Sequence, residues 1–315
     1  MEVEVAVDGG AEIGEGPCWD VAGQVLWWVD IPPGTLHRFE PSTGTDRPLA
    51  VGRPLGAVAV RRGGGLVLAV GDGFAVLEPE ALLPAVPPAT PPGGLPDLPP
   101  AGPPGVRVHL VAPVEAGDAA TRMNDGACDR RGRFFAGTMA WERTAGAGSL
   151  YRLDPDGAVE QVLCGLTLSN GIDWSPDGRT MYLVDSGHHR VDRFDFDEEH
   201  GRLAGRAPFI QVAPGEGMPD GLTVDAEGCL WVALYGRGVV RRFTAAGVAL
   251  PAFDVAVPAS KVTSCAFGDA DLGSLYVTSA TRGLTAEVRR LEPHAGAVFR
   301  ARPEVTGRAP SAYAG

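Results

Sequence analysis

The sequence predicts an all-β fold, a six-bladed β-propeller built from four-stranded antiparallel blades. Short runs of β-forming residues recur six times, and their starts lie 40, 68, 47, 49 and 45 residues apart. Within a repeat, a turn such as SPDG or DAEG separates the first two strand-like pieces, and its glycine supplies the positive φ that hairpins need. A period of about 40 to 50 residues with several strands per unit is typical of a propeller. An all-β sandwich with accidental spacing is the alternative.

The strands of each repeat can be placed in order. A repeat opens with a polar residue, a glycine and small or apolar residues, as in IGEGPCWDVAG (13–23). The second strands are expected at LWWVDI (26–31), LVLAVG (66–71), FFAGTM (134–139), MYLVDS (181–186), LWVALY (230–235) and LYVTSA (275–280). A third piece follows each, from TLHRFEP in the first repeat to GAVFRARP in the last. VEVAV (3–7) has no local partner, so we expect it to form the outer strand of the sixth blade and close the ring. Helix signals are nearly absent.

One long interval interrupts the repeat. The tract PAVPPATPPGGLPDLPPAGPPG (84–105) contains ten prolines, which cannot donate to a β-ladder and favour an extended, solvated loop. We expect a surface insertion between the third and fourth strands of blade 2, at the end of the channel opposite the predicted site. The rest of residues 1–315 is predicted to be a single propeller domain.

The composition of the chain argues against several classes of partner and of metal site. The chain has 315 residues and a net charge of −12 with no basic block, which argues against nucleic acid and anionic membranes as partners. It has no apolar run long enough to span a bilayer and no secretory leader pattern, so a cytoplasmic protein is expected. Its five cysteines include no CxxC pair, which favours neither a disulfide framework nor a thiolate zinc site. No obligate protein partner is evident.

The first strand of every propeller blade lines the central channel, so the residue before each repeated glycine should stand on one ring. By repeat, these residues are Glu15, Leu55, Asp125 (with Asn124 beside it), Asn170, Asp220 and Ser264. Four of the six blades thus offer oxygen ligands, which hard divalent cations prefer. A single Asn-Gly or Asp-Gly would indicate only a turn, but convergence on a ring favours a cation site.

Other polar residues are expected at the same end of the channel, here called the mouth, or in turns. The mouth loops carry Asp30, Trp141, Glu142, Asp185, His188, His189, Tyr235 and Arg237, with Arg122 and Lys261 at the entries to first strands. We interpret His188 and His189 as rim residues and not as metal ligands. Asp20, Asp129, Asp173 and Asp225 are predicted to cap hairpin turns, and Trp27, Trp28, Trp174 and Trp231 to pack between blades.

Several motifs together resemble the SMP-30/gluconolactonase/regucalcin family of six-bladed propeller lactonases. They are GEGPCWD, RMNDGACDRRGRFFAGTMAWE, LSNGIDWSPDG, MPDGLTVDAEGCLWVALY, KVTSCAFG and the ending APSAYAG, and they cover nearly the whole chain. The resemblance implies a divalent metal held by Glu15, Asn170 and Asp220. It also implies that Arg122, Asn124 and Glu142 face the substrate.

The activity that this resemblance implies is metal-dependent opening of a sugar (aldono-) lactone to its aldonic acid. Asp220 would act both as a metal ligand and as the general base that activates water. Two alternatives remain, an organophosphate-type hydrolase on the same metal site and a non-catalytic calcium-binding propeller. The sequence leaves open the metal (Ca²⁺, Mg²⁺, Mn²⁺, Zn²⁺ or Fe²⁺), the lactone and the oligomeric state.

Overall fold

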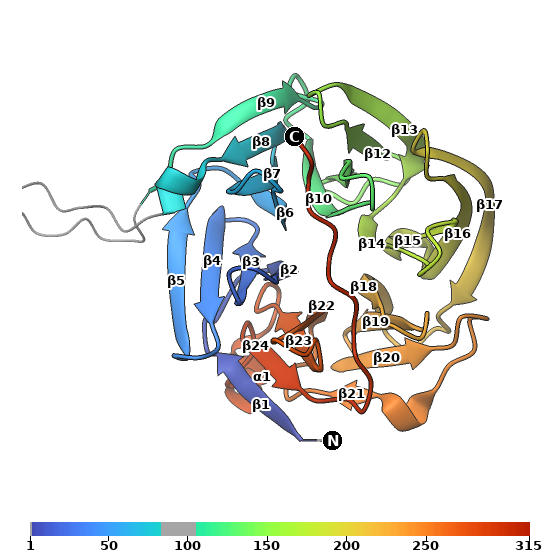
Figure 1. The fold of residues 1–315 in the computed structure, drawn as a ribbon. Helices are drawn as coiled ribbons and strands as arrows, with labels where there is room; N and C mark the ends of the chain where they lie inside the picture. The colour runs from blue at the N-terminus through green and yellow to red at the C-terminus, as the bar shows by residue number, and fades with distance from the viewer. Residues whose placement is uncertain (1, 83–104) are drawn as a thin grey trace, which may run out of the picture.

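A computed structural model describes residues 2–82 and 105–315. Six four-stranded antiparallel sheets surround a central channel (Figure 1). The innermost strands are β2 (Gly14–Asp20), β6 (Leu55–Val60), β10 (Thr121–Cys128), β14 (Ser169–Trp174), β18 (Met218–Val224) and β22 (Val262–Gly268). The second strands are β3 (Val25–Asp30), β7 (Leu66–Val70), β11 (Phe134–Ala140), β15 (Thr180–Asp185), β19 (Leu230–Tyr235) and β23 (Ser274–Ser279). The predicted propeller is therefore confirmed, and each second strand begins within one residue of its predicted start.

The outer half of each blade completes the ring. The third strands are β4 (Thr35–Glu40), β8 (Gly73–Leu77), β12 (Gly148–Leu153), β16 (Arg190–Asp197), β20 (Val239–Phe243) and β24 (Val298–Ala301). The outermost strands are β5 (Thr45–Ala50), β9 (His109–Pro113), β13 (Val159–Leu166), β17 (Arg202–Gln211), β21 (Val255–Ala256) and β1 (Val3–Val7). Strand β1 pairs antiparallel with β24, so the N-terminal strand closes the sixth blade as predicted.

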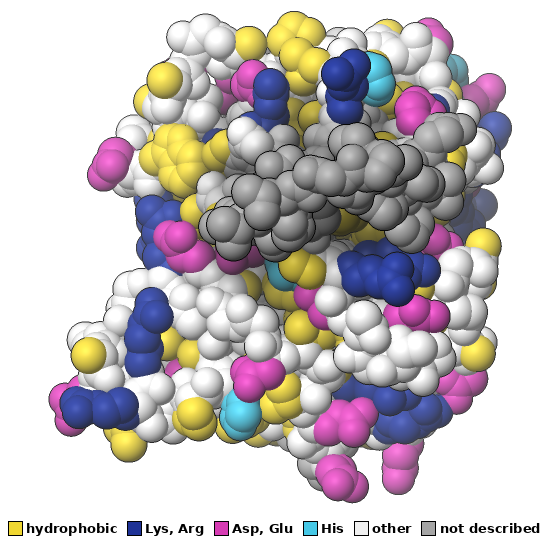
Figure 2. Space-filling model, turned by 90° about the vertical axis from the view of Figure 1, so that its left-hand side faces the viewer, with side chains coloured by type: hydrophobic (Ala, Val, Ile, Leu, Met, Phe, Trp, Pro, Cys, Tyr) yellow, Lys and Arg dark blue, Asp and Glu magenta, His cyan; other side chains and the backbone are white. Residues whose placement is uncertain are grey.

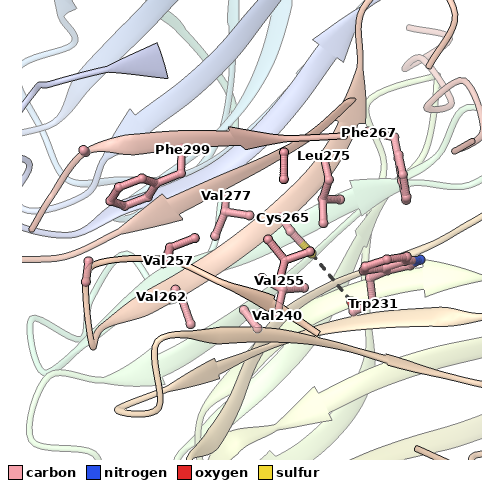
Figure 3. Close-up of a cluster of buried hydrophobic side chains, with 14 residues drawn as sticks. Trp231, Val240, Val255, Val257, Val262, Cys265, Phe267, Leu275, Val277 and Phe299 are labelled. Atoms are coloured by element: carbon pink, nitrogen blue, oxygen red, sulfur yellow. Dashed lines mark hydrogen bonds between the residues drawn. The ribbon is translucent and has the colours of Figure 1, made fainter. Parts of the chain in front are cut away.

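Apolar side chains between neighbouring blades form the core. Between blades 5 and 6, Trp231 of β19 meets Phe267 of β22 edge to face, with ring centroids 5.7 Å apart (Figure 3). In the same cluster, the Cys265 thiol donates to the Trp231 carbonyl over 3.6 Å. Trp27 packs between blades 1 and 2, and Trp174 between blades 3 and 4, which confirms the predicted role of these tryptophans.

Every innermost strand has a register break at its ring position. In β2 the pairing with β3 shifts between Glu15 and Cys18, and in β18 it shifts between Pro219 and Leu222. The pairings of β6, β10, β14 and β22 shift at equivalent places. A β-bulge bends the strand and redirects one side chain. Six bulges at one level therefore set the directions of the side chains around the channel.

Most of the predicted turn-capping aspartates are confirmed. Asp20 accepts from the Gly23 amide, and Asp225 accepts from the Cys229 amide. Asp129 likewise accepts from the turn amide of Arg133. Asp173 is the exception, and its prediction as a turn cap was wrong. Its carboxylate connects neighbouring parts of the fold. It accepts from the Val224 amide of the next blade at 2.7 Å and from Arg308 Nη2 of the C-terminal segment at 3.0 Å.

The C-terminal strap, residues 302–315, runs across the end of the channel opposite the mouth (Figure 1). It meets blade 5 where the Ala226 amide donates to Thr306, and blade 3 where the Ala314 amide donates to Gly132. It reaches blade 2 where the Tyr313 amide donates to Val60. The strap helps to enclose a small cavity of about 120 Å³ at that end.

Few elements depart from the β pattern. Helix α1 (Ala286–Leu291) follows β23, and its N-cap Thr285 accepts from the Val288 amide. The sequence TAEVRRL carries a recognisable start signal, a threonine cap with an acidic first turn and a basic last turn. Short 3₁₀ turns occupy Pro79–Leu82, Ser186–His188 and Pro251–Phe253. All five cysteines are free thiols.

The proline-rich tract predicted at 84–105 lies almost wholly outside the described residues. The strands on either side of it, β8 and β9, pair antiparallel as the third and fourth strands of blade 2. Over 2–82 and 105–315, no helix has both the length and the apolar character needed to cross a membrane.

Candidate active site

A cavity of about 420 Å³ opens at the mouth of the channel. Five of the six residues predicted for the site line it together, namely Glu15, Arg122, Asn124, Asn170 and Asp220. They come from blades 1, 3, 4 and 5, at or beside the bulges of the innermost strands. Residues far apart in the sequence therefore meet because the repeat places equivalent positions on one ring.

Two carboxylates are buried at this cavity. The residues Glu15 and Asp220 are 5% and 7% exposed, and among the described residues neither forms an ion pair. Glu15 accepts a hydrogen bond of 3.0 Å from the Gly16 amide. Burial raises the pKa of both carboxyls, and the negative charge of Asp220 raises that of Glu15 further. Two buried carboxylates without a cationic partner are costly, so the fold must retain them for another reason.

A hydrogen-bonded chain fixes the amides beside these carboxylates. Asn170 Nδ2 donates to Ser186 Oγ at 2.8 Å, which directs its Oδ1 to the other side, where it accepts from Asn124 Nδ2 at 2.6 Å. Asn124 Oδ1 in turn accepts from Arg122 Nη1 at 2.6 Å. Each amide thus has a defined orientation, and Asn170 lines the same cavity as the two carboxylates.

Arg122 is buried under the aromatic ring of Trp141, with its guanidinium carbon 4.9 Å from the ring centroid. Its Nε is buried without a hydrogen-bond partner among the described residues. Burial lowers the pKa of this guanidinium to about 10, although the charges of Glu15 and Asp220 act in the opposite direction. Arg122 therefore lines the cavity with its guanidinium held in place by Asn124 and Trp141.

Two aspartates predicted at the mouth have a supporting role. Asp30, at the end of β3, accepts from the Ile13 amide at 2.9 Å, just before Glu15. Asp185, at the end of β15, accepts from the Leu168 amide at 3.1 Å, just before Asn170. In both blades, an aspartate at the end of the second strand thus holds the segment that leads into the first strand. These carboxylates hold the positions of ring residues and do not face the cavity.

The structure does not bring Glu142 to the cavity. The turn after β11 closes when the Arg143 amide donates to the Ala140 carbonyl, and it leaves Glu142 exposed. Arg143, its neighbour, lines the cavity instead. Of the other mouth predictions, Tyr235 and Lys261 line the cavity. The His188 side chain lies outside it, 46% exposed and bonded to Asp185 Oδ2.

Sequence reasoning missed Arg143 and Arg282 at this site. Each lies in a connection whose length and turn type vary independently of the repeat, so the ring alignment carries no signal for them. The sequence also aligned Asp125 with the other ring residues. The structure places its side chain lower in the channel, against the cavity at the strap end, with its pKa raised to about 6 by burial.

Comparison with known proteins agrees with this architecture. Residues 13–281 match the family described as the SMP-30/Gluconolactonase/LRE-like region. Regucalcin of Xenopus laevis is 35% identical over 322 residues, covering 100% of this chain and 99% of the relative. YvrE of Bacillus subtilis (strain 168), named provisionally as a sugar lactone lactonase, is 32% identical over 323 residues, with coverage of 100% and 99%.

A solved structure is also similar over the whole length. The calcium-binding protein regucalcin from Agrobacterium tumefaciens strain C58 superposes with a TM-score of 0.88 at 28% identity, covering 99% of this chain and 97% of that one. The family match, the full-length relatives and the six blades all agree. The chain belongs to the SMP-30/gluconolactonase/LRE-like family.

Proposed function

We propose that this protein is a divalent-metal-dependent lactonase that opens a sugar lactone to its aldonic acid. One observation carries the proposal. Glu15 and Asp220 are both buried at the mouth cavity, which Asn170 also lines, and neither carboxylate forms an ion pair among the described residues. The relatives named as lactonases support the substrate class.

The residues present suit a hard divalent cation. Glu15 and Asp220 supply carboxylate oxygens, and Asn170 supplies the amide oxygen whose direction Ser186 fixes. Oxygen-only donor sets are the ones that Ca²⁺, Mg²⁺ and Mn²⁺ prefer. A cation there would offset the repulsion that raises the pKa of Glu15. When bound, it would polarise the lactone carbonyl and acidify water.

The chain's own residues supply the remaining steps. Arg122 and Asn124 orient the lactone, since both line the cavity together with Glu15 and Asp220. The oxygen of the attacking water bonds to the lactone carbonyl carbon, and Asp220 accepts a proton from that water. The bond between the carbonyl carbon and the ring oxygen then breaks, and the departing oxygen takes the proton from Asp220 to become a hydroxyl, which restores the Asp220 carboxylate. Glu142, exposed outside the cavity, has no step in this proposal.

Acid release from a panel of aldono-1,4- and 1,5-lactones tests the proposal. The protein is stripped of metal, reloaded with one cation at a time and assayed against the spontaneous rate. We expect hydrolysis that depends on the added cation. If no cation stimulates hydrolysis of any lactone, the proposed function is wrong.

The same preparation tests a second candidate, a calcium-binding propeller without catalysis, which the name of the Agrobacterium relative favours. Calorimetry of the stripped protein with Ca²⁺ measures binding directly. Tight binding of Ca²⁺ with no turnover of lactones or of organophosphate esters would support that candidate. Turnover of organophosphate esters alone would identify the other hydrolase class.

A further inference from the structure

The mouth cavity concentrates positive charge in a protein whose net charge is −12. Four of its seventeen lining residues are cationic, Arg122, Arg143, Lys261 and Arg282, whereas two are carboxylates. Arg122 and Arg143 belong to blade 3, and Lys261 and Arg282 to blade 6, which lies opposite across the ring. By contrast, basic and acidic side chains are interspersed on the outer side of blades 1 and 2 (Figure 2).

Few anionic groups among the described residues pair with Arg143, Lys261 and Arg282, whereas the two carboxylates of the cavity partly offset the charge of Arg122. Among the described residues, Arg143 forms no ion pair and no side-chain hydrogen bond. Arg282 Nη1 lies 3.7 Å from Glu12 Oε1, but both side chains are about half exposed, so this pair contributes little. Lys261 Nζ donates to the Arg282 carbonyl at 2.5 Å, which positions the ammonium group without cancelling its charge.

The cations are close enough to affect one another. Burial is the main cause that lowers the pKa of Arg122, and the charges of Arg282 and Arg143 lower it further, against the larger opposing effect of Glu15. After burial, Arg143 is also the main influence that lowers the pKa of Lys261. Crowding of like charges disfavours the empty cavity, and an anion between the two blades would relieve it.

The backbone at Arg143 has an unfavourable conformation, which it shares with a few other non-glycine residues of the described structure. Its φ is +56°, in the left-handed region that is disfavoured for an arginine. This conformation belongs to the turn that directs Arg143 to the cavity and leaves Glu142 in solvent. Unfavourable backbone conformations persist mainly where a binding or catalytic side chain needs them.

We propose that the substrate is a sugar lactone that carries an anionic substituent, a carboxylate or a phosphate, held between Arg143 of blade 3 and Lys261 and Arg282 of blade 6. The inference rests on the proposed function and names its substrate class. The lactone ring faces Glu15 and Asp220, and the substituent points outward to the rim. The guanidinium group of arginine suits both carboxylates and phosphates, because it can donate two parallel hydrogen bonds to them.

Matched pairs of lactones test this class. One pair is D-glucono-1,5-lactone and its 6-phosphate, and the other is D-galactono-1,4-lactone and D-galactaro-1,4-lactone, which carries a carboxylate at C6. We expect kcat/KM to favour the anionic member of at least one pair by about tenfold or more, and the preference to fall as salt rises. The pair with the larger preference identifies the substituent.

Substitutions then link this preference to the cations. R143Q and R282Q should each lower the anionic-to-neutral ratio of kcat/KM by about tenfold. R290Q is the matched control, because Arg290 is exposed on the neighbouring helix and does not line the cavity. The inference is overturned if the neutral members are hydrolysed as well as or better than the anionic ones. It is also overturned if R143Q and R282Q leave the anionic-to-neutral ratio of kcat/KM unchanged.

A binding measurement separates this inference from the proposed function. Calorimetry compares 1,5-anhydro-D-glucitol with its 6-phosphate, neither of which contains a lactone bond. Stronger binding of the phosphate by wild type than by R143Q supports an anion site even if no lactone is hydrolysed. Equal binding of the two compounds, alongside turnover of neutral lactones, overturns the anion site and leaves the lactonase intact.

Discussion

At the scale of single residues, the proposed site depends on buried charged side chains that form no ion pair among the described residues. Glu15 and Asp220 are buried anions, and Arg122 is a buried cation with an unused donor. Arg122 is near enough to lower the pKa of both carboxyls, yet burial dominates and both remain raised. A protein that only needed stability would have neutral side chains here.

In the proposed mechanism, Asp220 is both a metal ligand and the general base, so its replacement can separate cation binding from catalysis. D220N keeps an oxygen donor of the same size but removes the proton acceptor. We expect kcat to fall by about 100-fold or more, while calorimetry still detects cation binding, although weakened. Near-normal turnover in D220N with its cation retained would place the general base elsewhere.

At the scale of elements, the bulged innermost strands explain why the ring could be predicted. Each repeat carries its polar residue beside a glycine, and the structure uses several of these glycines for close approach between blades. A Cβ on Gly171 would lie 2.3 Å from the Leu222 amide nitrogen of the next blade. The glycines therefore let neighbouring first strands approach near the axis, which brings the ring residues together.

The hairpin connections were harder to predict. The blades, the closing strand β1 and the ring positions of Glu15, Asn170 and Asp220 follow from a repeat that recurs in the sequence itself. The choice of Arg122 and Asn124 as site residues came from the family resemblance. The directions of Glu142 and Arg143 depend on one tight turn outside the strands, where the repeat does not fix which side chain faces the cavity. Asp173 resembled the other turn aspartates, but the strap places Arg308 beside it, a contact 135 residues distant in sequence. Local patterns carry no information about such a contact.

Gly221 tests the close approach of blades 5 and 6. A Cβ there would lie 2.0 Å from Ser264 Oγ and 2.6 Å from its Cα, so the neighbouring strand must move. We expect G221A to lower the free energy of unfolding by about 1–3 kcal/mol in urea titrations and to reduce cation affinity, because Asp220 shifts with the strand. G63A is the control, since its Cβ meets nothing within 4 Å. Equal stability of the two variants would contradict this account.

At the scale of the whole molecule, three buried carboxyls from three blades lie near one another in the channel. Asp125 raises the pKa of both Glu15 and Asp220 by repulsion, in addition to burial. The ring therefore concentrates negative charge along the axis while the mouth concentrates positive charge. This arrangement makes the stability of the metal-free protein depend on pH.

Asp125 sets the sign of that dependence. Its pKa rises from the ordinary 3.8 to about 6 on folding, so the folded state binds a proton more tightly than the unfolded state. Asp125 therefore contributes to the free energy of unfolding at low pH. This contribution, on the order of 3 kcal/mol, is lost as pH rises from about 4 to about 6. The raised pKa values of Glu15 and Asp220 act in the same direction.

Urea unfolding of the metal-free protein across this pH range measures the effect. We expect D125N to reduce the loss, and a saturating divalent cation to oppose it at pH 7 by binding the folded state. A stability that stays flat from pH 4 to pH 7 in the metal-free wild type would contradict this interpretation.

The strap has a consequence for how the chain acquires its activity. Its contacts span long distances in sequence, 84 residues from Arg308 to Val224 and 254 residues from Gly315 to Arg61. Loops of that length close slowly, so local hairpins are expected to form before the ring is complete. Glu15 and Asp220 lie on opposite sides of the junction that β1 and β24 close. During refolding, the β-sheet signal should therefore return first, and lactone hydrolysis only after both ends of the chain have docked.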